Sequence, residues 1–119
     1  MDIRLGVGKG QHSIVYNEGT ANGNHAISEG YMSIANGTNS HAAGYQTTAA
    51  SDNQFVIGKH NEEDKSSKYA FIVGNGYSAE KSNAHTLDWD GRAWFAGDIY
   101  TGEDSKKLST EEYVDDKID

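Results

Sequence analysis

The chain has 119 residues, a formal net charge of −8 at neutral pH, and neither cysteine nor proline. Its acidity argues against a nucleic-acid partner, the lack of cysteine excludes disulfides and thiolate chemistry, and no apolar run reaches the roughly 18 residues of a membrane span. Only 19 residues are Ile, Leu, Val or Phe, a share below the roughly 20% at which a chain builds an ordinary core. Seven tyrosines and a regular pattern argue against disorder, so we expect several copies to share one core.

A seven-residue repeat runs from Asn17 to Gly58 and reads NEGTANG, NHAISEG, YMSIANG, TNSHAAG, YQTTAAS and DNQFVIG. The third and fifth residues of the blocks are almost always small, and glycine ends five of the six blocks: Gly23, Gly30, Gly37, Gly44 and Gly58. A coiled coil needs large apolar residues where this repeat has Gly and Ala, and glycine destabilises a helix. The helical interpretation therefore fails.

Each block instead predicts a short strand followed by a turn, with its third and fifth residues on one buried face. Glycine at each corner is expected to supply a positive φ. Two blocks would form a coil of about 14 residues, and stacked coils a narrow solenoid that gains stability by packing against copies of itself. Ile27, His41 and Phe55 are spaced by 14 residues on one side, and Ile34 and Thr48 on the other. One of these sets should face the axis of the oligomer.

A polar stretch, KHNEEDKSSK, follows at residues 59–68 and indicates an exposed loop. We expect its acidic residues, Glu62, Glu63 and Asp64, to be solvated. The apolar run YAFIVG comes next and resembles QFVIG before the loop. The two runs are expected to pair as a long hairpin that caps the solenoid.

The segment SNAHTLDWDGRAWFAGDIYTG alternates in polarity on both sides of Asp90-Gly91, which predicts a hairpin turn. Asp88 and Asp90 could begin a calcium loop, but the further oxygen ligands that such a loop needs do not follow, so the turn is the better interpretation. Near the end of the chain, Ser109 and Glu112 have the spacing of a capping box and predict the start of a helix.

The run GYMSIANGTNSHAAGYQTTAAS resembles the head repeats of trimeric autotransporter adhesins. It is more similar still to repeats in tail and appendage proteins of phages and prophages of Gram-positive bacteria. The resemblance covers about residues 8–58, although QHSIVYNEG is out of phase with the later blocks. The SNAHTLDWDG element and the KLSTEEYVD tail are similar to elements that follow the repeats in those phage proteins.

The resemblance implies an all-β fold: a left-handed parallel β-roll, or solenoid, in an intertwined homotrimer, followed by a β-hairpin junction and the start of a C-terminal helix. The expected segments are the β-roll at 1–58, a loop and capping strand at 59–83, the trimer junction at 84–102, and a linker with the helix start at 103–119. The residues expected to anchor the trimer lie in the junction: Leu87, Trp89, Trp94 and Phe95.

The implied function is that of a rigid structural segment in a trimeric phage tail fibre or baseplate appendage, located on the virion and outside the cell. Its partners would be its own copies and other tail proteins, with a host-cell glycan or protein as a further candidate. One alternative is the head of a bacterial trimeric adhesin that binds host matrix or glycan. Another is a module that precedes a self-cleaving intramolecular chaperone.

No motif for catalysis, a metal or a cofactor emerges, and we expect the chain not to be an enzyme. Gly6-Val7-Gly8 begins like a dinucleotide fingerprint, but QHS interrupts it. The five histidines are spaced by 13, 16, 19 and 25 residues, so we expect no single stack of them. His41 could hold an ion on a three-fold axis if it faces inward, while a solvated or packed histidine is the simpler interpretation.

Overall fold

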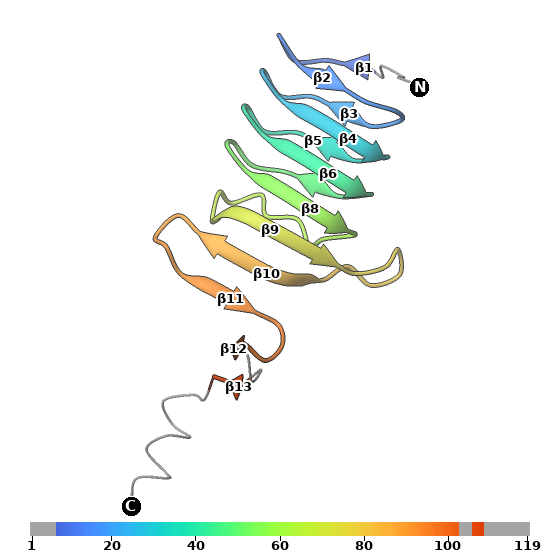
Figure 1. Cartoon of the computed structure of the whole chain (residues 1–119). Helices are drawn as coiled ribbons and strands as arrows, with labels where there is room; N and C mark the ends of the chain where they lie inside the picture. The colour runs from blue at the N-terminus through green and yellow to red at the C-terminus, as the bar shows by residue number, and fades with distance from the viewer. Residues whose placement is uncertain (1–6, 103–105, 109–119) are drawn as a thin grey trace, which may run out of the picture.

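The computed structural model describes residues 7–102 and 106–108. Parallel strands of two sheets wind together as a solenoid whose coils stack along one axis (Figure 1). No helix occurs among the described residues, so none there is long and apolar enough to cross a membrane. The fold is all-β, as the repeat predicts.

The short sheet contains two-residue strands in the order β1-β3-β5-β7: β1 (Val7–Gly8), β3 (Thr20–Ala21), β5 (Ile34–Ala35) and β7 (Thr48–Ala49). The long sheet begins with four parallel strands: β2 (Ile14–Val15), β4 (Ile27–Tyr31), β6 (His41–Tyr45) and β8 (Phe55–Lys59). It continues through three more: β9 (Tyr69–Asn75), β10 (Asn83–Asp88) and β11 (Ala93–Phe95). The chain thus passes alternately through the two sheets, and each coil from β1 to β8 contributes one strand to each sheet.

The register confirms the predicted 14-residue coil in the middle of the solenoid. Ile27 pairs with His41 and His41 with Phe55, while Ile34 pairs with Thr48 in the other sheet. The first coil has 13 residues, because Ile14 pairs with Ile27. This shorter coil explains why the sequence before the first regular block is out of phase.

The interior is narrow and is filled by small side chains. The third and fifth residues of all six blocks are buried: Gly19, Ala21, Ala26, Ser28, Ser33, Ala35, Ser40, Ala42, Thr47, Ala49, Gln54 and Val56. Larger apolar side chains are buried toward the two ends of the coil stack, with Val15 at one end and Val56 and Ile72 at the other. Little apolar area is removed from water in the middle coils, so hydrophobic burial inside one chain is weak there.

The repeat glycines serve two different purposes. Gly30, Gly44 and Gly58 have positive φ values of 92°, 115° and 98°, as predicted for corner residues. Gly23 and Gly37 do not, and at these two the predicted reason is wrong. A Cβ at any of the five glycines would overlap a backbone carbonyl of the next coil, so at Gly23 and Gly37 the close approach of stacked chains alone selects glycine.

Of the two hairpins predicted after the repeat, the structure contains only the second. The expected hairpin between the apolar runs is wrong, because β8 and β9 pair in parallel, with Phe55 opposite Phe71. The loop between them therefore belongs to an enlarged coil of 16 residues. The second hairpin is confirmed: β10 and β11 are antiparallel and the chain reverses at Asp90-Gly91.

Beyond β11 the described chain contains one small antiparallel pair, β12 (Tyr100–Thr101) with β13 (Lys106–Lys107). The predicted helix start at Ser109 lies outside the described residues. The molecule is elongated, with principal extents of 61 × 30 × 29 Å.

Candidate functional site: an outer ladder and a polar end cap

The outer face of the long sheet carries a continuous row of mainly apolar side chains. Parallel, in-register pairing places equivalent residues of successive coils directly above one another. Ring centroids are 4.4 Å apart for His41 and Phe55 and 6.0 Å apart for Phe55 and Phe71. The row continues onto the hairpin, and we call it the outer ladder: Ile14, Ile27, His41, Phe55, Phe71, His85 and Phe95.

Much of this ladder is open to solvent. The exposed fraction is 41% for Ile14, 39% for Phe55 and 46% for Phe95. A second row beside it adds apolar residues from the same face, including Ile57 and Val73, which pair with each other. An apolar strip that runs along a whole sheet is a feature of interaction surfaces, because monomeric proteins rarely expose large contiguous apolar patches.

One close side-chain hydrogen bond lies within this face. The Nε2 atom of His41 is 2.6 Å from an Oε1 atom of Glu29, and the His41 ring packs on Phe55. His41 thus faces outward from the solenoid interior, with a carboxylate partner in its own chain. Among the described residues no group of three or more His, Cys, Asp or Glu side chains could hold a metal ion.

Histidines and tyrosines also stack along the edges of the coils. His12 and His25 stack with ring centroids 5.1 Å apart. The 13-residue first coil brings them into register. Tyr31 and Tyr45 stack at 5.0 Å, and both are exposed.

The four residues predicted to anchor the trimer lie on different faces of the junction. Leu87 pairs with Phe71, and Phe95 pairs with His85, so Leu87 and Phe95 extend the face of the outer ladder. Trp94 pairs with the buried Thr86 and lies on the opposite face. Trp89 is in the hairpin turn. Their role in a trimer stays a prediction.

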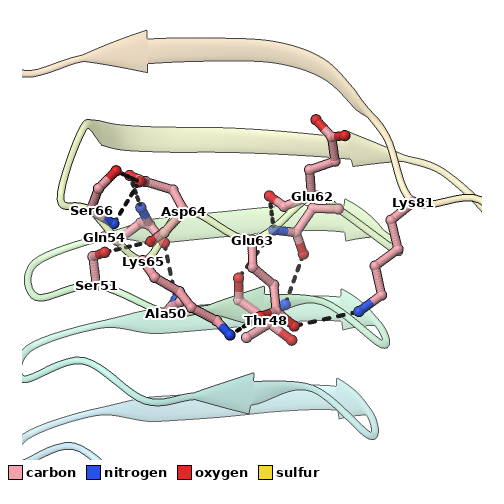
Figure 2. A network of polar contacts seen from close by, with 11 residues as sticks. Thr48, Ala50, Ser51, Gln54, Glu62, Glu63, Asp64, Lys65, Ser66 and Lys81 are labelled. Carbon is pink, nitrogen blue, oxygen red and sulfur yellow. Dashed lines mark hydrogen bonds and ion pairs between the residues drawn. The ribbon is translucent and has the colours of Figure 1, made fainter.

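The short sheet ends at β7, and side chains take the place of its next strand (Figure 2). The amide of Asn61 accepts a hydrogen bond from the Thr48 N–H at 2.8 Å and donates one to the Thr48 carbonyl at 3.1 Å. The Ala50 N–H donates to Oε1 of Gln54 at 3.1 Å. These three backbone groups are therefore satisfied without a further strand, which hinders edge-to-edge pairing.

Asp64 organises this cap. Its carboxylate accepts hydrogen bonds from the backbone N–H groups of Ser66, Lys68 and Tyr69, and from the side chains of Ser66 and Gln54. Burial raises the pKa of Asp64, but the Tyr69 N–H and the donors of Ser66 and Lys68 outweigh it and lower the pKa below its ordinary value. The prediction of an exposed loop is thus wrong for His60, Asn61 and Asp64, which are buried, although Glu62 and Glu63 are exposed.

Asp88 builds the hairpin turn. Its carboxylate accepts hydrogen bonds from the backbone N–H groups of Asp90 and Arg92, and Arg92 Nε lies 2.9 Å from Oδ2. The Arg92 N–H, together with the charge of its guanidinium, lowers the pKa of Asp88. Gly91 has a φ of 87° and donates its N–H to the Asp88 carbonyl. These contacts favour a three-residue turn with a left-handed glycine over a calcium loop.

An open hollow of about 490 Å³ lies between the cap loop and the hairpin. It exists because the long sheet continues through β10 and β11 after the short sheet has ended. Trp94 and Ala93 line it on the hairpin side, and Glu62, Asp64 and Tyr69 line it on the loop side.

Comparison with protein-family models, with curated proteins and with solved structures found no match to this chain. The resemblance described above therefore rests on the sequence motifs quoted for it.

Sequence reasoning missed the cap. The available signal was the interval of 16 residues between Phe55 and Phe71, which departs from the spacing of the preceding coils. An insertion at that point indicates a coil that closes differently. Which polar side chains replace the strand could not be read from the spacing.

Proposed function

We propose that this chain is a structural segment of a homotrimeric fibre, of the kind found in a phage tail or baseplate appendage. In this proposal three left-handed β-rolls intertwine and pack through the outer ladder. The observation that supports it best is the ladder itself, a mainly apolar row of exposed and half-buried side chains that extends along the long sheet from β2 to β11.

The thin interior supports self-association for an energetic reason. Middle coils bury Ala and Ser, whose contribution to the hydrophobic effect is small, whereas the larger apolar side chains point outward along the ladder. Covering the ladder with copies of itself would remove that area from water. A solenoid suits such a symmetric arrangement, because identical chains present the same ladder to one another along their whole length.

The architecture supports the role of a spacer, because stacked coils build an elongated molecule. Assignment to a virion outside the cell, with other tail proteins as neighbours, follows from the resemblance of the hairpin and the tail of the chain. Leu87 and Phe95 continue the ladder into the junction, and we assign them to the trimer contact. Catalysis forms no part of the proposal.

Light scattering coupled to size exclusion tests the trimer. The chain is expected to have the mass of three copies, and Phe55→Glu is expected to lower it to one copy, because the substitution would bury a charge in the interface. Ile34→Glu is the matched control, since Ile34 lies in strand β5 of the short sheet and the ladder lies on the long sheet. A mass of one copy for the unsubstituted chain, or dissociation by Ile34→Glu alone, would contradict the proposal.

A further inference from the structure

The hollow between the cap loop and the hairpin is lined by an exposed tryptophan, Trp94, which capping the solenoid does not explain. Trp94 has an exposed fraction of 53% and forms part of the hairpin wall. A large aromatic ring at the end of a core would normally be covered, because burial of its surface contributes strongly to stability. Here its indole borders an open space of about 490 Å³, a size typical of sites for small molecules, which span roughly 300–1,000 Å³.

Polar groups surround this aromatic surface, and several are held in fixed positions. Arg92 donates from Nε to Asp88 and from Nη2 to Asp90, each at 2.9 Å, so its guanidinium is oriented before any ligand arrives. On the loop side, the Glu62 N–H donates to the Asn83 side chain at 2.8 Å. Such contacts preorganise a rim of hydrogen-bonding groups.

The charge of the lining selects among ligands. Four carboxylates line the hollow against two cationic side chains: Glu62, Glu63, Asp64 and Asp88 against Lys68 and Arg92. This excess of negative charge disfavours sulfated, phosphorylated or carboxylated ligands. An uncharged ligand needs one apolar face for the indole and many hydroxyl groups for the rim. A pyranose ring has both.

We propose that this hollow binds a neutral saccharide unit, with its apolar ring face on Trp94 and its hydroxyl groups toward Glu62, Glu63 and Arg92. The site does not depend on the number of copies in the oligomer. Trp94 and Phe95 are neighbours in one strand and face opposite sides, so packing through the outer ladder leaves the hollow open.

A glycan array probed with the labelled full chain tests this site. We expect binding to neutral glycans, reduced roughly tenfold or more by Trp94→Ala, because truncation of a central aromatic group typically has an effect of this size. Trp89→Ala is the matched control, since Trp89 is similarly exposed but does not line the hollow. The control should bind like the unsubstituted chain.

No binding to neutral glycans, preference for sialylated or sulfated glycans, or equal binding by the Trp94→Ala chain would each overturn the proposal. Light scattering of Trp94→Ala separates this site from the fibre contact. Its mass should equal that of the unsubstituted chain, whatever that mass is, and a change would mean that Trp94 belongs to the interface between copies and not to a sugar site.

Discussion

Side chains in the interior of this solenoid face backbone at close range, so single atoms matter. Ser40 illustrates this. It is 1% exposed, and its hydroxyl has no hydrogen-bond partner among the described residues. The equivalent position one coil earlier is Ala26, which is fully buried without any polar group. The hydroxyl of Ser40 therefore carries a desolvation cost with no compensating bond.

Ser40→Ala is predicted to stabilise the fold by about 1 kcal/mol, because it removes a buried hydroxyl and leaves the backbone contacts in place. Urea unfolding followed by circular dichroism measures the change. Ser28→Ala is the comparison, since the Ser28 hydroxyl donates to the Ser33 carbonyl at 2.6 Å, and it should destabilise by about 1 kcal/mol. If Ser40→Ala were the less stable of the two, the hydroxyl would have a partner after all.

At this scale the sequence predicts burial well and backbone conformation only in part. Small residues at fixed block positions are enough to assign the interior. Positive φ is adopted by Asn39 and Asn53, which tolerate it, but also by Met32 and Gln46. Those two residues carry no local signal for a left-handed conformation. The geometry of the stacked corner imposes it.

Among the elements, the cap loop shows how an open sheet edge can be closed without a strand. Side-chain amides of Asn61 and Gln54 occupy the positions that peptide groups would take, and Asp64 gathers the donors of the returning loop. The sequence could not reveal this, because the loop composition alone suggests solvation. The parallel pairing of β8 with β9 was missed for another reason, because two apolar runs that are adjacent in sequence usually form a hairpin.

Asp64→Asn is predicted to destabilise the chain by about 2–3 kcal/mol at neutral pH, because the amide leaves several donors without a carboxylate. The folded-state pKa of Asp64 is lowered, so its contribution to stability is present above the ordinary value of 3.8 and is lost as pH falls through the folded value. Thermal unfolding midpoints of the two chains should therefore converge below about pH 4.

The exposed residue Glu18 provides the control for this comparison. Glu18→Gln should change the free energy of unfolding at neutral pH by no more than about 0.5 kcal/mol, as ordinary surface substitutions do. A difference between Asp64→Asn and the unsubstituted chain that stayed constant down to low pH would show that the carboxylate charge is not what holds the cap.

For the whole molecule, the 14-residue period predicts the architecture more reliably than any individual residue does. It identifies the coil, the two faces and the buried positions, because a solenoid repeats one local solution. It does not identify the number of copies or the partner on the outer ladder. Those depend on surfaces between chains, about which the residues of one chain carry less specific information.

Removal of residues 34–47 is predicted to leave a folded, shorter solenoid. The deletion joins Ser33 to Thr48, and because Ile34 and Thr48 are equivalent in register, one coil is removed and the neighbours meet in phase. The chain should keep its β-sheet circular dichroism and unfold at a lower denaturant concentration, since one coil interface is lost.

Removal of residues 34–43 is the control for that deletion. It joins Ser33 to Gly44 within strand β6, so equivalent positions no longer align and the shortened chain should lose its sheet signal. Equal stability of the two shortened chains would contradict the phase argument.

The coil also sets a unit of length. Each coil adds one strand spacing, about 4.8 Å, along the axis, whereas the same number of residues in an α-helix would rise about 21 Å. In-frame duplication of one coil in the gene would thus lengthen the protein in small, equal increments while both ends keep their contacts. Reach could then change between related genes by copy number alone, without any new side chain having to evolve.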